Sequence, residues 1–124
     1  MNLCNAAVAE DVDLTGTWES RYQFGPVEEL MIASIKHIGS SLLGSFTVTP
    51  SSGEGYSGVL FGTAEGENVR ANYLCVRSRG AGDPQLVVIY IDSRIADRDT
   101  LRGSYYVQDS DMNSFSGSFE AKRR

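Results

Sequence analysis

The sequence contains little of the material from which disulfide frameworks, metal centres and histidine-dependent active sites are built. Its 124 residues include two cysteines, three prolines, one tryptophan and one histidine. Two cysteines, Cys4 and Cys75, can form at most one bridge, which excludes a disulfide-rich fold and makes free, buried thiols the simpler expectation. Because the only histidine is His37, the close ligand spacings of a zinc site are missing, and we expect no metal and no cofactor.

Long apolar runs and an excess of positive charge are also missing. No segment approaches the roughly 18 apolar residues of a membrane-spanning helix, so a membrane is not an expected partner. Lys and Arg number 11 against 16 Asp and Glu, which gives a net charge of −5. Because nucleic-acid-binding surfaces neutralise phosphates with basic side chains, nucleic acid is not an expected partner either. The first ten residues carry no basic side chain and do not form a secretory signal, so a cytoplasmic location is expected unless a signal peptide has been removed.

Glycine is abundant, with thirteen residues, and it recurs two positions before an aromatic side chain. The pattern of glycine, serine or threonine, and aromatic occurs at Gly16–Trp18, Gly44–Phe46, Gly103–Tyr105 and Gly117–Phe119. Residues two apart share one face of a strand, so each glycine lies beside its aromatic residue. A glycine in that position lets a sheet bend and leaves room for a large ring, which predicts a strongly curved sheet.

Alternation of apolar and polar residues predicts eight strands joined by short polar turns. They are expected at residues 14–22, 28–38, 42–49, 56–64, 69–77, 85–95, 100–108 and 112–122. No helix of ten residues fits between any two of them. Sequential hairpins predict an all-β fold, an up-and-down antiparallel barrel of about eight strands, with a two-sheet β-sandwich as the alternative.

The chain is expected to form one domain. The barrel comprises residues 14–124, and residues 1–13 precede it as a short helix or a disordered segment. The length suits a single domain with a real hydrophobic core.

The strand at residues 85–95 differs from the others because its centre is apolar without interruption. A strand with water on one side should alternate, so this one is expected to be covered on both faces. In a single-layer barrel the outer cover is a second chain. We therefore expect a homo-oligomer that associates through Val87, Ile89 and Ile91.

The opening of the first strand, Gly16-Thr17-Trp18, resembles the calycins, which comprise the lipocalins, the fatty-acid-binding proteins and the avidins. The resemblance implies a barrel with the indole packed at a closed base and a small ligand in the lumen. It also implies a basic residue near the end of the last strand that covers the ring, and Lys122 or Arg123 is placed to do so.

The sequence departs from each branch of that superfamily. It has neither the helical lid of the fatty-acid-binding proteins nor the Thr-Asp-Tyr motif of the lipocalins. In avidins the position two residues after the tryptophan contacts the ligand, and here it is Ser20. The later tryptophans that wall the biotin site have no counterpart, because Trp18 is the only one. An avidin-like or lipocalin-like barrel that does not bind biotin is therefore the expectation.

A candidate ligand site follows from the aromatic and polar residues projected onto the inner face. These are Trp18, Ser20, Tyr22, Phe46, Tyr73, Tyr90, Asp92, Tyr105 and Phe119. An apolar lumen with a few polar groups suits a small, partly hydrophobic molecule. The alternative is that the rings fill the interior of so small a barrel.

Two further functional hypotheses stay open. One is a barrel enzyme of the isomerase or cyclase type, acting on a hydrophobic substrate with Tyr, Asp or Arg from the lumen. No catalytic residue is assigned, because no Gly-x-Ser-x-Gly elbow occurs and His37 directly precedes a turn. The other is an interaction or structural protein that works through its outer face. The acidic pairs Glu28-Glu29 and Asp109/Asp111 are best explained as solvated turn residues.

Overall fold

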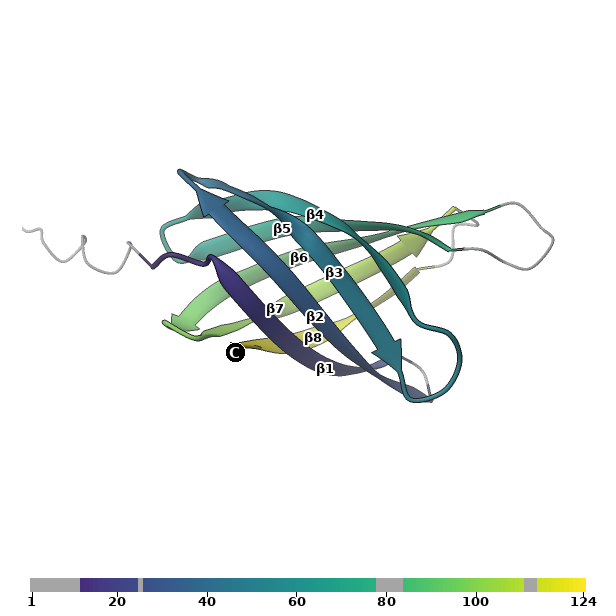
Figure 1. Ribbon diagram of the computed structural model, residues 1–124. Coiled ribbons are helices and arrows are strands. Elements are labelled where there is room, and N and C mark those ends of the chain that lie inside the picture. Colours follow the sequence, from purple (N-terminus) through teal and green to yellow (C-terminus); the bar gives the residue numbers. More distant parts are fainter. Residues whose placement is uncertain (1–11, 25, 78–83, 111–113) are drawn as a thin grey trace, which may run out of the picture.

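The computed structural model describes residues 12–24, 26–77, 84–110 and 114–124. It contains eight strands, namely β1 (Gly16–Phe24), β2 (Val27–Ile38), β3 (Ser41–Pro50), β4 (Tyr56–Glu65), β5 (Asn68–Arg77), β6 (Gln85–Asp97), β7 (Thr100–Asp109) and β8 (Ser114–Arg123). Each strand pairs with the next in antiparallel register, and β1 pairs with β8, so the sheet closes into an up-and-down barrel (Figure 1). The barrel prediction is confirmed, and closure excludes the sandwich.

The two ends of the barrel differ in what they carry. One end, here called the base, holds residues 12–15 and the C-terminus, which lie side by side in Figure 1. The opposite end, here called the mouth, holds the connection between β1 and β2 and the loop at residues 51–55. The prediction of a helix or disorder for residues 1–13 falls almost entirely outside the described residues. Among the described residues, no helix is long and apolar enough to cross a membrane.

The inner face of most strands is the predicted one. On β1 the side chains of Trp18 and Ser20 are buried, and on β5 Val69, Ala71 and Tyr73 are buried. The glycine–aromatic pattern also points inward, because Phe46 and Tyr105 are buried in the same core. Alternation with polar outer residues on β1 and β5 therefore identified the inner face correctly.

The faces of β6 are the reverse of the prediction. Val87, Ile89 and Ile91 are buried inside the barrel, so they cannot contact a second chain. Tyr90 and Asp92 lie on the outer face. The cause is a register shift between Ile95 and Asp97 in the pairing of β6 with β7, which places Tyr105 opposite Ile91 and not opposite Asp92. One extra residue at such a bulge turns every preceding side chain to the other face.

Glycines at inner positions allow the strands to curl. A β-carbon at Gly62 would lie 2.6 Å from the Cα atom of Ala71 on β5. A β-carbon at Gly103 would lie 2.5 Å from the Cα atom of Ser93 on β6. Because these distances are shorter than carbon atoms tolerate, any larger residue would push neighbouring strands apart, and the tight curvature of the barrel requires glycine there.

Candidate functional site

The base of the barrel is closed around Trp18, which is 2% exposed. Its indole N–H donates to the carbonyl oxygen of Leu14 at 3.0 Å, and Leu14 is fully buried beside it. The guanidinium of Arg123 lies over the indole, with its central carbon 4.7 Å from the ring centroid. The basic cover expected from the end of the last strand is therefore Arg123. Lys122 instead extends toward Thr100, with its Nζ 3.4 Å from the threonine hydroxyl.

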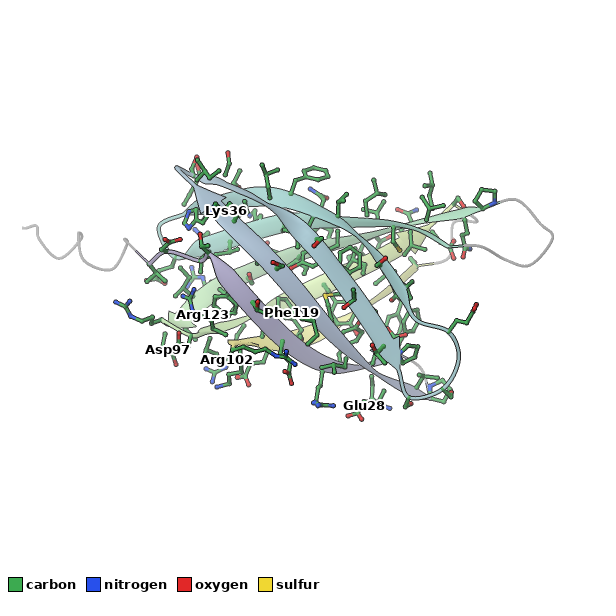
Figure 2. The ribbon with its side chains drawn as sticks, in the orientation of Figure 1. Glu28, Lys36, Asp97, Arg102, Phe119 and Arg123 are labelled. Atoms are coloured by element: carbon green, nitrogen blue, oxygen red, sulfur yellow. The ribbon has the colours of Figure 1, made fainter. Side chains whose placement is uncertain are left out.

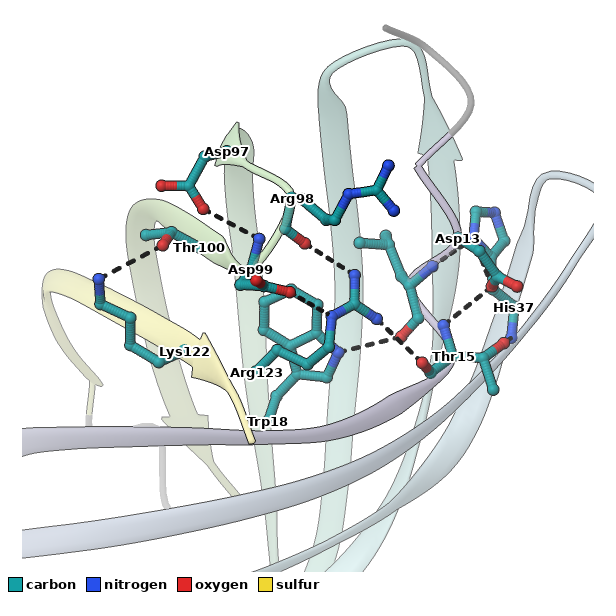
Figure 3. A network of polar contacts seen from close by, with 11 residues as sticks. Asp13, Thr15, Trp18, His37, Asp97, Arg98, Asp99, Thr100, Lys122 and Arg123 are labelled. Atoms are coloured by element: carbon teal, nitrogen blue, oxygen red, sulfur yellow. Dashed lines mark hydrogen bonds and ion pairs between the residues drawn. The ribbon is translucent and has the colours of Figure 1, made fainter.

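Arg123 also fixes three chain segments at the base, as Figure 3 shows. Its guanidinium donates to the carbonyl oxygens of Thr15 at 2.9 Å and Arg98 at 2.7 Å. It donates in addition to the carboxylate of Asp99 at 2.9 Å. These contacts join the segment before β1, the turn between β6 and β7, and the end of β8. Arg123, fixed by these contacts, covers one face of Trp18, and the base forms a closed floor for the lumen.

His37 also belongs to the base and not to the lumen. Its Nδ1 accepts a hydrogen bond from the backbone N–H of Leu14 at 3.0 Å. The backbone N–H of His37 donates to the hydroxyl of Thr15 at 3.0 Å. Both contacts hold the segment before β1 against β2. In this arrangement His37 links the segment before β1 to β2.

The lumen contains one partly enclosed cavity of about 60 Å³ whose lining comes from all eight strands. Most of its walls are apolar, with Leu60, Ile91 and Val107 among the aliphatic contributors. A single water needs on the order of 10–15 Å³ of such space, so the cavity admits on the order of four to six non-hydrogen atoms. The remaining interior is filled by side chains, for example by Phe46 and Tyr73, whose ring centroids are 5.1 Å apart. The lumen is thus mostly filled but not completely.

The predicted site residues divide into three groups. Six of them line the cavity: Trp18, Ser20, Tyr22, Tyr73, Tyr105 and Phe119. Figure 2 shows Phe119 among the side chains enclosed by the strands. Phe46 is buried in the core but does not line the cavity. Tyr90 and Asp92 lie outside the barrel, where Asp92 pairs with Arg70 at 3.6 Å, so their assignment to the lumen is wrong.

Ser20 is engaged with the barrel wall. Its hydroxyl donates to the backbone carbonyl of Glu120 on β8 at 2.8 Å, across the seam where the first and last strands meet. The side chain therefore supports closure of the barrel. Its oxygen keeps an acceptor site toward the cavity that it lines.

Aromatic rings gather near the mouth. The rings of Tyr22 and Tyr105 are 5.7 Å apart, those of Tyr105 and Phe115 are 6.1 Å apart, and Phe24 stacks on Phe115 at 4.9 Å. We call Tyr22, Phe24, Tyr105 and Phe115 the mouth cluster. Because such tilted and stacked pairs are mutually attractive, the four rings form a defined wall at this end of the cavity.

A buried carboxylate lies next to the mouth cluster. Glu29 on β2 is 6% exposed and stands directly opposite Tyr22 on β1. It accepts a hydrogen bond from the hydroxyl of Tyr56 at 3.2 Å. The hydroxyl of Tyr22 is buried and makes no hydrogen bond of standard geometry with any described residue. The mouth end of the lumen therefore combines a negative charge with a tyrosine hydroxyl that has unused bonding capacity.

The tyrosines at this end stay protonated at neutral pH. Burial raises the pKa of Tyr22, and the nearby Tyr56 and Glu29 raise it further. Burial, with a contribution from Glu29, also raises the pKa of Tyr105. In both cases the physical cause is that a phenolate would be poorly solvated and would lie beside a negative charge. The two hydroxyls can therefore donate as well as accept.

Sequence reasoning missed Glu29, which it assigned to a solvated turn. A usable signal was present, because a two-residue connection between Phe24 and Val27 pairs residue 22 with residue 29. Residues that face each other across antiparallel strands share a face, so an inward Tyr22 implies an inward Glu29. Phe24 and Phe115 were missed as well, because they lie close to strand ends.

Other chemistry finds little support. No group of three or more His, Cys, Asp or Glu side chains that could hold a metal ion occurs among the described residues. Comparison with protein-family models, with curated proteins and with solved structures finds no match. The functional proposals below therefore rest on the geometry of the barrel, its lumen and its outer face.

Proposed function

We propose that the protein binds one small, mostly apolar molecule in its lumen. The observation that carries the proposal is the cavity of about 60 Å³ between the closed base and the mouth cluster. An empty apolar cavity destabilises a packed core, because the atoms of its walls lack dispersion contacts on one side. A ligand of four to six non-hydrogen atoms would recover those contacts.

The two ends of the lumen differ in polarity, and this difference would orient a bound ligand. Its base is the apolar face of Trp18, and the hydroxyl of Tyr22, buried without a hydrogen bond of standard geometry, lies near the mouth. A buried hydroxyl without a partner gains from a hydrogen bond with a ligand. We therefore infer a ligand with an apolar body toward Trp18 and one hydrogen-bonding group toward Tyr22.

The likeness to calycins supports this proposal without establishing the family. A tryptophan at the base of the first strand, covered by a basic residue from the last strand, is what the resemblance implied. Trp18 and Arg123 have this arrangement. The fold by itself says little about activity, so the small-molecule assignment rests on the cavity.

The test uses n-butanol and n-pentanol, which match the size of the cavity. Trp18 is the only tryptophan and lines the cavity, so its fluorescence should report occupancy. We expect saturable changes in emission. The substitution Ala33→Leu, beside Trp18 in the lining, should abolish them while circular dichroism shows an intact barrel.

Tyr90→Phe, on the outer face, serves as the control and should bind the alcohols as the wild type does. Emission that stays constant up to the solubility limit of both alcohols would contradict the proposal. So would equal binding by the wild type and by Ala33→Leu, because the cavity would then not be the site.

A second candidate function is self-association through an outer apolar face. This face comprises exposed side chains of β3 to β7, namely Leu43, Val59, Phe61, Val76, Leu86, Val88, Tyr90 and Tyr106. Strand pairing makes the face continuous, because Leu43 is opposite Phe61 and Tyr90 is opposite Tyr106. We infer that a second copy of the chain covers it, in place of the association through Val87, Ile89 and Ile91 expected from the sequence.

Size and charge favour a second copy. The eight side chains are 38% to 59% exposed. With roughly 150–250 Å² for each large side chain, they offer on the order of 700 Å², close to the roughly 800 Å² that each partner buries in a stable complex. The chain has a net charge of −5, so two copies repel each other least where they meet through this largely apolar face, beside which Arg70 and Asp92 carry opposite charges and pair at 3.6 Å.

Sedimentation velocity on the full chain tests this second candidate. We expect a dimer or higher oligomer that dissociates in the variant Val59→Lys/Val88→Lys. The control Thr47→Lys/Thr63→Lys adds the same charge at exposed polar positions of β3 and β4 and should leave the assembly intact. A wild-type protein that sediments as a monomer at all concentrations would contradict it.

A further inference from the structure

We propose that the lumen selects a ligand whose polar group is a cation, such as a protonated amine. The inference rests on the proposed function and adds the chemical class of the ligand. The geometry that carries it is the buried carboxylate of Glu29 beside the mouth cluster of aromatic rings.

The first step concerns the charge on Glu29. A buried carboxylate is costly unless a cation or several hydrogen bonds compensate for the loss of water. Glu29 accepts a hydrogen bond from the hydroxyl of Tyr56 at 3.2 Å, and the hydroxyl of Tyr22 lies close enough for the carboxylate to raise the pKa of that tyrosine. No lysine, arginine or histidine side chain in the described ranges pairs with it, and Arg21, from the same end of β1, instead approaches Glu19 at 3.8 Å. Glu29 thus has acceptor capacity and a negative charge that nothing in the described protein neutralises.

The second step concerns the rings. Aromatic faces attract organic cations, and several rings around one position form the cages that recognise alkylammonium groups. Tyr22, Phe24 and Tyr105 line the mouth end of the cavity, and Phe115 packs behind them. Tyr56 lines the same end of the cavity, close to the hydroxyl of Tyr22. This combination of ring faces and a nearby carboxylate favours an ammonium group over an anion, which the negative charge of Glu29 would repel.

The third step explains how Glu29 acts on a ligand that it does not contact directly. Glu29 is absent from the cavity lining, whereas Tyr22 and Tyr56 are part of it. Tyr56 donates to the carboxylate and also lines the cavity, so it connects Glu29 to the ligand space. An ammonium group at these hydroxyls would lie within one side chain of the carboxylate, where low polarity strengthens the attraction.

The experiment compares three probes with the same four-carbon chain: n-butylamine, n-butanol and butyrate. At pH 7.5 the first is a cation, the second is neutral and the third is an anion. Binding to the full chain is measured by Trp18 fluorescence and by calorimetry. We expect n-butylamine to bind at least about tenfold more tightly than n-butanol, and butyrate not to bind.

Two variants then test whether the preference for n-butylamine depends on the charge of Glu29. Glu29→Gln removes the charge with little change in shape, and we expect n-butylamine and n-butanol to bind it equally. Glu28→Gln makes the same change one residue earlier, where the side chain is exposed and points away from the barrel (Figure 2). It should keep the tenfold preference.

Equal binding of all three probes to the wild type would overturn the cation inference but leave lumen binding in place. Tight binding of butyrate would overturn it in the same way, as would a preference for n-butylamine that survives Glu29→Gln. Failure of all three probes to bind would overturn the proposed function itself. The comparison of probes on the wild type is decisive even if Glu29→Gln does not fold.

Discussion

The ring of Tyr105 on β7 occupies the space that a β-carbon on Gly117 of β8 would need. The two residues are directly opposite in the strand pairing. A β-carbon at position 117 would lie 2.7 Å from the tyrosine oxygen and 2.9 Å from Cζ. The glycine of one glycine–aromatic pattern thus makes room for the aromatic residue of another. The shape of the mouth cluster depends on this pairing.

The substitution Gly117→Ala should therefore displace the ring of Tyr105. We expect a loss of about 1–3 kcal/mol in the free energy of unfolding, which is typical of an overpacked core. Urea denaturation measures it. Ser118→Ala, at the next and exposed position of β8, should change stability by less than about 0.5 kcal/mol. Equal stability of the two variants would show that the ring is not confined by Gly117.

Arg123 should matter for stability far more than its neighbour Arg124. Arg123 covers Trp18 and donates to three groups at the base. We expect Arg123→Ala to cost about 2–3 kcal/mol, since charged hydrogen bonds and a ring contact are lost together. Arg123→Lys should recover only part of this, because an ammonium group lacks the planar fork.

The control for that prediction is Arg124→Ala. Arg124 pairs with Glu19 at 3.0 Å, but its side chain is 55% exposed. Exposed pairs contribute little, so the loss should be under about 1 kcal/mol. Thermal unfolding followed by circular dichroism measures both variants. A loss for Arg124→Ala that matches the loss for Arg123→Ala would contradict the role given to the base network.

Tyr22→Phe should leave the fold intact. The hydroxyl of Tyr22 is buried without a hydrogen bond of standard geometry, so its removal deletes a desolvated polar group and only looser interactions with Tyr56 and Glu29. We expect stability to stay the same or to rise by up to about 1 kcal/mol. Affinity for n-butanol should fall, because the ligand loses its hydrogen-bond partner. A stability loss above about 2 kcal/mol would instead indicate that the hydroxyl is well bonded in the native state.

High pH should destabilise the protein. Burial raises the pKa values of Tyr22 and Tyr73 above the ordinary value of 10.0. A raised pKa means that the stabilising contribution is complete below about pH 10 and is lost as the pH rises further, because the unfolded chain releases its protons first. Urea midpoints should stay level from pH 8 to 9 and fall between pH 10 and 11.5. The fall should be shallower in the variant Tyr73→Phe, and an equal fall in that variant would contradict the assignment.

The architecture could be predicted from the sequence because strand periodicity and glycine placement independently indicated the same inward-facing positions of a curved sheet. Each inner glycine permits curvature at a position where alternation independently predicts an inward face. The eight predicted strands differ from the observed ones by only one or two residues at most ends. Short turns between most successive strands favoured consecutive hairpins over the crossover connections of the alternative sandwich.

The candidate site was less accessible because it depends on registers that hydrophobicity alone does not determine. β6 is apolar on both faces, with Ile89 inside and Val88 outside, so its pattern fits either orientation. The register shift at Ile95 decides between them, and nothing in the local composition marks it. Glu29 was missed because the usual rule gave a definite but incorrect answer: a charged residue near a turn is usually solvated, whereas this one is buried.

The most direct test of lumen binding is an isotope-filtered NOE spectrum of the full chain with unlabelled n-butanol. The proposal predicts contacts from the ligand to the methyl groups of Leu60, Ile91 and Val107, which line the cavity. It predicts no contacts to Val59 and Val88. These two side chains face outward, although each directly precedes a residue that lines the cavity, Leu60 and Ile89 respectively. Contacts confined to Val59 and Val88 would place the molecule on the outer surface and contradict the account.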